Sequence, residues 1–379
     1  MASYAAALSE HPLATQAVGE AVGQLLDEVG PAPDLAMLFV TVPHAGALED
    51  ISRAVRSLLN PRVLMGSSAV SVVGGAREVE DGPGIALWAG RFGVDLEPVR
   101  LEAFRSGDGS ILVAGGGVIG QNDGTLLMIA DPFSFPTEDI LEHLAEVSPG
   151  VSIIGGLASS GRGPGGNTLV LDDERFTDGA VGVWLPPSVA VSPLVSQGCR
   201  PIGQAMTVTK SEGTMIRELA GQPALDRLMS LIDSLPAEDR DLAAQGLHIG
   251  IVVDEHRHDF GRGDFLIRGV VGADREAGAV AVTDAVEVGT TVQFHVRDAG
   301  TAHDDITALL MGRSASSAVV FTGAERGSHL LGDFDHDAAV LSAALGGRPI
   351  AGMFSSGEIG PIRGRNALHG AAASVALFP

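Results

Sequence analysis

The chain has 379 residues, of which 24 are basic and 47 are acidic, and its formal net charge is −23. That charge opposes binding to nucleic acid and to anionic lipid, because both partners are bound through cationic side chains. A single cysteine excludes a disulfide framework and any multi-cysteine metal or cluster site. We therefore expect neither nucleic-acid nor membrane partners, no metal and no cofactor.

The N-terminal segment gives a first indication of location. No lysine or arginine precedes Glu10, so the segment lacks the charged start of a signal peptide. No apolar run approaches the roughly 18 residues that span a bilayer. We expect a cytoplasmic protein whose residues 1–30 form an amphipathic helix. Its expected apolar face consists of Ala17, Val18, Val22, Leu25 and Leu26.

A repeated pattern organises the rest of the chain. β-branched strands are predicted at 36–42, 126–130 and 318–322, and each is followed by a helix with apolar spacing of three and four. The predicted helices span residues 47–59, 137–147 and 335–345. After each helix comes an apolar run containing Gly and Ser, and then a later β-rich run. This recurrence predicts β-α-β-β modules.

A fourth, degenerate copy of the module begins with a predicted strand at 247–253. A charged segment precedes the next apolar run at 265, which leaves little room for a helix. We therefore predict an α/β fold of tandem βαββ modules, forming two pseudo-symmetric domains with mixed sheets covered by helices. An αββα sandwich is one arrangement that satisfies this pattern. The division is expected in the polar region 221–245, giving domains 1–222 and 223–379.

The last module carries the densest group of candidate ligand-binding residues. These are Ser355, Ser356, Gly357, Glu358, Arg363, Asn366 and His369. Glycine lets a ligand approach backbone N–H groups, and serine supplies an adaptable donor or acceptor. Glu358 could pair with a ligand ammonium and an arginine with its carboxylate, which would suit an amino acid. The alternative is a salt bridge from Glu358 to Arg363 or Arg365 that binds no ligand.

Equivalent turns in the first two modules contain Gly66, Ser67 and Ser68, and then Ser159 and Ser160. Their recurrence is compatible with one composite pocket in each domain. A repeated hairpin also needs Gly and Ser simply to turn, and this explanation requires no ligand.

Two further candidates lie outside these turns. His44 follows the first strand, where pockets of α/β proteins form, although a solvent-exposed histidine is the alternative. Arg200, next to the lone Cys199, could bind a carboxylate through two hydrogen bonds or serve the structure. The histidine-rich segment 254–259 matches no metal motif, and a solvated loop is the preferred interpretation.

Four motifs together resemble the FIST family. They are QGCRPIG at 197–203, FLIR at 265–268, VRD at 296–298, and PIAGMFSSGEIGP at 349–361 with His369-Gly370 downstream. The resemblance extends from about residue 34 to the end of the chain. It implies a FIST N-terminal domain followed by a FIST C-terminal domain. The family's first turn typically reads Gly-Cys-Ser followed by Gly-Glu, whereas this chain has Gly66-Ser67-Ser68, which implies an altered N-terminal pocket.

The resemblance also implies a bacterial sensory protein of signal transduction that binds a small molecule, with amino acids as the proposed ligands. Because no output domain is evident, we expect a stand-alone sensor with a separately encoded signalling partner. A homodimer is expected only because homodimers are the commonest oligomers of soluble proteins, and not from a feature of this sequence. One alternative is a scaffold whose sheet edges recruit a partner. Another is a hydrolase or transferase with Ser68 or Ser356 as nucleophile, but no G-x-S-x-G elbow is present and no catalytic residue is assigned.

Overall fold

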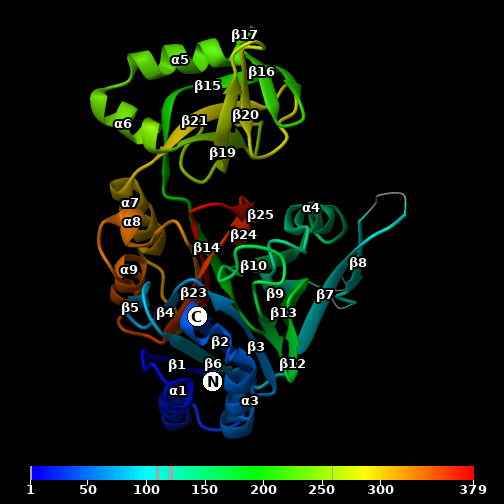
Figure 1. Cartoon of the computed structure of the whole chain (residues 1–379), viewed down its shortest axis with the longest axis vertical. Helices are drawn as coiled ribbons and strands as arrows, with labels where there is room; N and C mark the ends of the chain where they lie inside the picture. The colour runs from blue at the N-terminus through cyan, green and yellow to red at the C-terminus, as the bar shows by residue number, and fades with distance from the viewer. Residues whose placement is uncertain (1, 108–110, 118, 120–122, 258) are drawn as a thin grey trace. The chain divides into compact units, whose positions relative to one another are not determined.

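The computed structural model describes residues 2–107, 111–117, 119, 123–257 and 259–379. The chain divides into two compact units (Figure 1). The first unit comprises Met1–Val195 and Thr307–Pro379, and the second comprises Ser196–Ile306. Helices and mixed sheets confirm the predicted α/β class.

The described residues of the first unit form three sheets. The first sheet has the order β1 (Ser3–Ser9), β6 (Ile85–Arg91), β2 (Leu35–Thr41), β3 (Val63–Ala69), β11 (Leu169–Leu171) and β12 (Glu174–Phe176). The second has the order β25 (Arg365–His369), β24 (Glu358–Ile362), β10 (Val151–Leu157), β9 (Gly124–Ala130), β13 (Ala180–Leu185), β7 (Glu97–Arg105) and β8 (Ile111–Gly115). The third has the order β14 (Ser192–Ser196), β26 (Ala373–Phe378), β22 (Ser317–Gly323), β23 (Ile350–Ser355), β4 (Val72–Gly74) and β5 (Arg77–Val79).

Each sheet is built around one parallel pair, namely β2–β3, β9–β10 or β22–β23. Helices connect the two strands of each pair, as a parallel crossover requires. These helices are α2 (Val42–Ala45) and α3 (Leu48–Leu59), α4 (Thr137–Val147), and α8 (Gly327–Leu331) and α9 (His336–Ala344). The three predicted strand–helix pairs are therefore present with nearly the expected bounds.

The three hairpins that follow the parallel pairs are exchanged in a ring. Hairpin β4–β5 follows β3 in the chain but pairs with β23. Hairpin β11–β12 follows β10 but pairs with β3, and β24–β25 follows β23 but pairs with β10. Each hairpin therefore completes the sheet of another module, and the segment 307–379 packs with the N-terminal half of the chain.

Three glycines mark equivalent points of the parallel pairs. Gly66, Gly155 and Gly352 lie opposite Leu38, Met128 and Val320, respectively. A Cβ atom on these glycines would lie 2.2, 1.8 and 1.9 Å from the carbonyl oxygen of the opposing residue. Only glycine fits so close a backbone approach. Gly66, predicted to bind ligand, thus has a packing role at its position.

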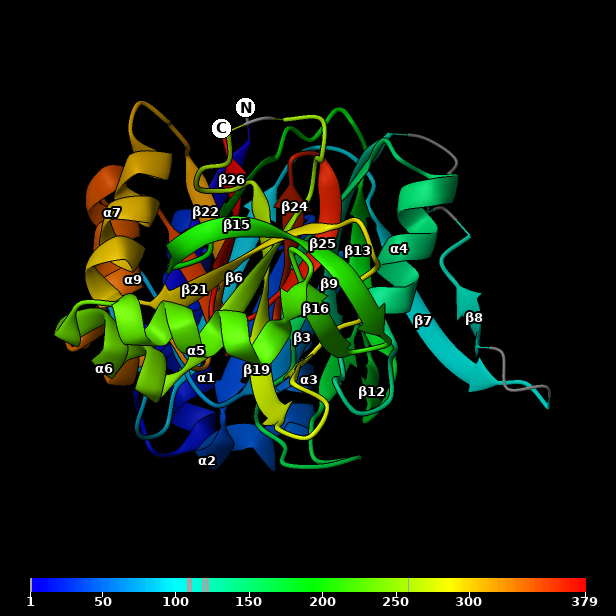
Figure 2. The ribbon, with the colours of Figure 1, turned by 90° about the horizontal axis from the view of Figure 1, so that it is seen from above.

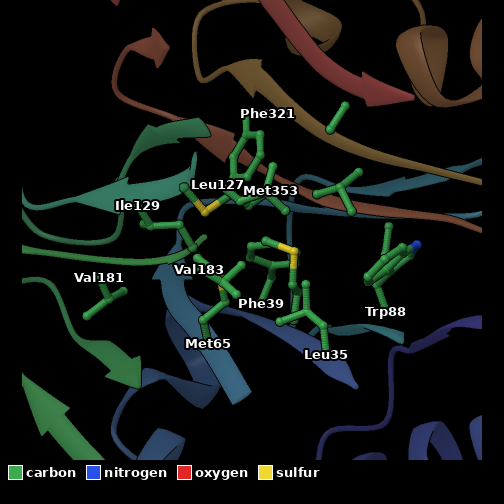
Figure 3. Close-up of a cluster of buried hydrophobic side chains, with 14 of the residues drawn as sticks. Leu35, Phe39, Met65, Trp88, Leu127, Ile129, Val181, Val183, Phe321 and Met353 are labelled. Carbon is green, nitrogen blue, oxygen red and sulfur yellow. The ribbon is translucent and has the colours of Figure 1, made fainter. Parts of the chain in front are cut away.

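The main hydrophobic core is shared by all three sheets (Figure 3). Phe39 of β2 and Phe321 of β22 meet edge to face with ring centroids 6.1 Å apart, and Leu127 of β9 joins them. Helices α1 (Ala14–Glu28) and α3 cover the outer face of the first sheet, and α4 packs on the second sheet. Three sheets around one core thus replace the two sheets of an αββα sandwich.

The N-terminus differs from the prediction of one helix over residues 1–30. Ser3–Ser9 form strand β1, which pairs antiparallel with β6, and the helix begins only at Ala14. Buried and half-buried residues alternate along β1, which is the pattern of a strand at a sheet edge. The expected apolar helix face is correct, since Ala17, Val18, Val22 and Leu25 are buried.

The second unit has one sheet in which the described pairings are antiparallel. Its order is β15 (Cys199–Glu212), β21 (Thr291–Arg297), β18 (Leu247–Val252), β19 (Phe265–Asp274), β20 (Ala279–Val282), β16 (Met215–Leu219) and β17 (Gln222–Pro223). Its helices are α5 (Ala224–Ser234) and α6 (Ala237–Gln245), and α7 (Ala299–Leu310) follows across the sequence boundary.

The expected fourth module therefore has another structure. The described residues between β18 and β19 form no helix, and the chain returns as β19 in antiparallel pairing, because a parallel return needs a crossover connection. Upstream of it, the apolar spacing of residues 215–232 suggests one helix, but this stretch forms β16 and β17 before α5 begins.

Candidate ligand-binding site

In α/β sheets, ligands bind where loops leave the carboxyl ends of parallel strands. Three equivalent loops of the first unit leave β2, β9 and β22, and they differ in what their polar groups contact. His44 follows β2 in α2 and is buried, with its Nε2 3.1 Å from the backbone oxygen of His11. This histidine is not the exposed loop residue of the alternative interpretation.

The loop after β22 contains Arg326, whose side chain is fully buried. Its Nε and Nη2 donate to the two carboxylate oxygens of Asp337 at 2.8 and 2.9 Å, and Thr322 Oγ1 donates to the same carboxylate at 2.7 Å. Burial alone would raise the pKa of Asp337. The Arg326 charge and the hydrogen bonds outweigh burial and hold this pKa well below its usual range. The pair is a structural ion pair inside the unit.

A second buried carboxylate lies beside this ion pair. Glu78, carried by the exchanged hairpin β4–β5, accepts the backbone N–H of Ala338 at 2.9 Å. Burial, and then the neighbouring Asp337, raise the pKa of Glu78 to about 8, against the lowering effect of that N–H. No local sequence pattern indicates this group, because only the exchange of the hairpin brings Glu78 to α9.

The loop after β9 is bordered by a cleft of about 240 Å³. The lining residues come from this loop, the first turn of α4 and the strands β10 and β25; they are Pro132, Phe135, Pro136, Thr137, Glu138, Asp139, Leu157 and Leu368. Thr137 is only 4% exposed, and its Oγ1 has no hydrogen-bond partner among the described residues. Because a buried hydroxyl is normally bonded, its unpaired state points to a missing partner.

A buried network of polar side chains holds this loop in place. Asp131 accepts hydrogen bonds from Asn167 Nδ2 at 2.9 Å and from Ser134 Oγ at 2.6 Å. Asn167 Oδ1 in turn accepts from Ser160 Oγ at 3.2 Å, and Ser160 Oγ lies 2.6 Å from Ser68 Oγ. Two of the recurring serines thus meet, and they support the loop from behind rather than line the cleft.

The other serines of the repeated turns are dispersed. Ser67 Oγ donates to the backbone oxygen of Ser68, and Ser356 is exposed. Ser355 is buried next to Gly156, and a Cβ atom added to Gly156 would lie 2.2 Å from Ser355 Oγ. Gly357 packs against two residues that line the cleft, since a Cβ on it would lie 3.1 Å from the side chains of both Leu157 and Leu368.

Three of the remaining candidates of the last module are bonded to the backbone of the protein. Glu358 Oε2 accepts the N–H of Ala372 at 2.8 Å, and Arg363 is exposed. Asn366 bonds the N–H of Ile153 and the C=O of Val151 at 2.9 and 2.8 Å. His369 Nε2 lies 3.0 Å from the backbone oxygen of Gly360.

Arg200 belongs to the second unit, and the candidates of the last module belong to the first. It forms ion pairs with Asp239 and with Asp298, the latter at 2.7 Å. Hydrogen bonds from its guanidinium to these carboxylates raise the pKa of Arg200 further above its usual value. This arrangement favours the structural role of Arg200.

The alternatives based on catalysis or metal binding gain no support from these contacts. Ser68 Oγ is bonded to Ser160 and to the backbone of Thr168, and not to a histidine. Within the described part of the chain, no group of three or more His, Cys, Asp or Glu residues could hold a metal ion. His258, part of the histidine-rich segment, lies outside the described residues.

Sequence reasoning missed the cleft for two reasons. Thr137 was visible as the start of a predicted helix after the loop DPFSFP, and that loop at a strand end was the available signal. Leu368 had no local signal, because it reaches the cleft through the hairpin β24–β25 exchanged from a distant part of the chain.

The fold and the cleft together define an α/β protein with a cleft at the carboxyl edge of a mixed sheet. Family models for the FIST N domain and the FIST C domain match residues 34–222 and 224–361, so the chain belongs to the FIST family. Both domains are consistent with a sensory role in signal transduction. In the described residues, no helix is long and apolar enough to cross a membrane.

Relatives of similar length occur in mycobacteria. An uncharacterized protein of Mycobacterium bovis is 43% identical over 375 residues, which cover 97% of this chain and 96% of the relative. An uncharacterized protein of Mycobacterium tuberculosis is 41% identical over 379 residues, which cover 98% of each chain.

Proposed function

We propose that this FIST protein is a sensory protein that binds a small molecule in the cleft at the start of α4. The observation that carries the proposal is the buried, unpartnered hydroxyl of Thr137 in the wall of that cleft. Leaving such a hydroxyl unpaired costs about 1–3 kcal/mol, and a ligand that bonds to it removes this penalty.

The chemistry of the lining favours an apolar amino acid or a related metabolite. Apolar contacts come from Phe135, Leu157 and Leu368 together with the prolines of the loop. The N-terminal turn of α4 favours a carboxylate, because its first N–H groups have no partner within the helix and the helix dipole is positive there. Glu138 and Asp139 of the same turn favour a ligand ammonium. The volume suits a ligand smaller than a drug-sized molecule.

The other two equivalent loops support this choice by contrast. His44 after β2 and Arg326 after β22 are both buried and bonded within the protein. Of the polar groups named in these three loops, Thr137 at the cleft after β9 is the one whose buried hydroxyl has no partner among the described residues.

Thermal unfolding with and without leucine, phenylalanine, lysine or glutamate tests the proposal. A ligand at 100 times its Kd stabilises the folded state by about 2.7 kcal/mol, which raises Tm. We expect leucine or phenylalanine to raise Tm, and Thr137→Val to abolish the shift. The control is Glu358→Gln, which keeps an acceptor for the Ala372 N–H and should leave the shift unchanged.

Two analogues of leucine separate the charged groups. 3-Methylbutylamine lacks the carboxylate, and 4-methylpentanoate lacks the ammonium. Weaker shifts with both would support recognition of the zwitterion. The proposal is refuted if none of these compounds shifts Tm, or if Glu358→Gln removes the shift while Thr137→Val keeps it.

A further inference from the structure

Three large apolar side chains are exposed near the β7–β8 hairpin. Phe104 on β7 is 51% exposed, Leu112 on β8 is 58% exposed, and Phe133 in the loop after β9 is 43% exposed. Phe104 and Leu112 are directly paired across the hairpin, so both side chains stand on the same face. We name these three residues the arm patch. Clustered apolar side chains of this size on a protein surface mark an interaction site.

The arm patch borders a second cleft. This cleft has a volume of about 350 Å³, and Phe104 and Phe133 line it together with Ala103 and Ile111. A cleft of this volume lined by apolar side chains has room for an apolar side chain of a partner.

Strand β8 lies next to the patch at the end of its sheet. In the described part of the sheet, β7 is its only neighbouring strand, so one edge of its backbone remains open to further pairing. The hairpin projects beyond the other strands of the sheet in both views (Figure 1; Figure 2). An open strand edge beside apolar pockets is the arrangement by which proteins bind extended peptides through β-strand addition.

Charge indicates what kind of segment would bind. Helix α4 lies beside the hairpin in both views, and its sequence holds four carboxylates and no lysine or arginine (Figure 2). These carboxylates are Glu138, Asp139, Glu142 and Glu146, and all are exposed. The whole chain carries a net charge of −23. A second copy would bring an equally acidic helix to this edge, so charge complementarity favours a basic partner.

We propose that β8 and the arm patch dock an extended segment of a separate protein, in which apolar residues alternate with lysine or arginine. The segment adds a strand to the edge of β8, its apolar side chains cover Phe104 and Leu112, and its basic side chains face α4. This docking is independent of the ligand proposed above.

One consequence does rest on the proposed function. Both clefts are lined by Pro132, Phe135 and Pro136. A ligand in the smaller cleft therefore contacts the same loop that lines the larger cleft beside the arm patch. The ligand can therefore alter partner binding through this one loop.

The test uses a fluorescein-labelled decapeptide of alternating valine and lysine, with binding followed by fluorescence anisotropy. The variant Phe104→Thr/Leu112→Thr removes the apolar contact and keeps residues that favour strands. The control is Leu58→Thr, which changes a leucine of similar exposure, 53%, on α3. We expect the double variant to weaken binding about tenfold, which corresponds to about 1.4 kcal/mol, and the control to bind like the wild type.

Hydrogen exchange adds a readout that nonspecific charge attraction would not change. Amides of residues 111–115 should gain protection when the valine–lysine peptide binds, and a peptide with five valines followed by five lysines should give no such protection. Equal affinity of the double variant and the wild type would overturn the proposal. So would self-association by light scattering that the double variant abolishes, because the edge would then bind a second copy.

Discussion

The substitution Thr137→Val tests directly whether the buried hydroxyl in the cleft lacks a partner. Valine has nearly the same shape as threonine, so the apolar contacts of residue 137 are kept. Because Oγ1 is buried and unbonded, its replacement by a methyl group removes a desolvation penalty of about 1–3 kcal/mol. We expect the free energy of unfolding to rise by about 1 kcal/mol without ligand, and Tm by about 2 °C.

The matched control is the same substitution at Thr322. This threonine is also buried, but its hydroxyl donates to the ionised Asp337 at 2.7 Å. Hydrogen bonds to charged groups contribute about 1.5–3 kcal/mol, so Thr322→Val should lower the free energy of unfolding by about that amount. Urea denaturation of both variants measures the two effects. If Thr137→Val destabilises the protein as strongly as Thr322→Val, the Thr137 hydroxyl is bonded, and the argument for the cleft is refuted.

Three further predictions concern the buried charges and the parallel strands. Because the folded-state pKa of Glu78 is raised to about 8, the folded protein holds more protons than the unfolded chain between about pH 4.5 and 8. The free energy of unfolding should therefore fall as pH rises through this window, by at most about 1.4 kcal/mol per pH unit. Glu78→Gln should flatten this dependence on pH. A difference in free energy of unfolding between wild type and variant that stays constant with pH would contradict the prediction. Arg326→Met breaks a buried ion pair and should cost about 3–5 kcal/mol in urea denaturation, whereas Arg53→Met at an exposed pair should cost less than about 1 kcal/mol. Gly66→Ala places a Cβ against a backbone oxygen and should lower Tm strongly. The control is Gly19→Ala in α1, which should raise Tm slightly because a Cβ there meets nothing within 4 Å. Similar Tm values for the two variants would count against the close contact between the parallel strands.

The local structure of the parallel pairs could be predicted from the sequence. The strands β2, β9 and β22 are short apolar runs buried along most of their length, and the helices α3 and α4 after the first two have a clear apolar spacing. Such elements carry their signal within about a dozen residues. Strand β1 had a weaker signal, since a short alanine-rich segment before a helix fits either structure until its pairing with β6 is known.

The candidate site was only partly predictable. The sequence pointed to Gly and Ser at strand ends, and those residues do lie at the carboxyl ends of the parallel strands. Their hydroxyls, however, mostly bond to the protein itself, as Ser68 does with Ser160. Which hydroxyls are left without a partner depends on the contacts of the whole fold. Among the described residues these are Ser152, Ser355 and Thr137, and of the three only Thr137 lines the cleft.

By itself the sequence determined the α/β class, the three strand–helix units, the family and the acidic surface, because each of these depends on local patterns or on composition. Only the tertiary structure decided which hairpin completes which sheet, and therefore which residues meet. Leu157 and Leu368 are more than two hundred residues apart in the chain, yet both line the cleft because β24–β25 pairs with β10. Strand pairing over such separations is set by the complementary burial of whole sheets around a shared core, and no local pattern records it.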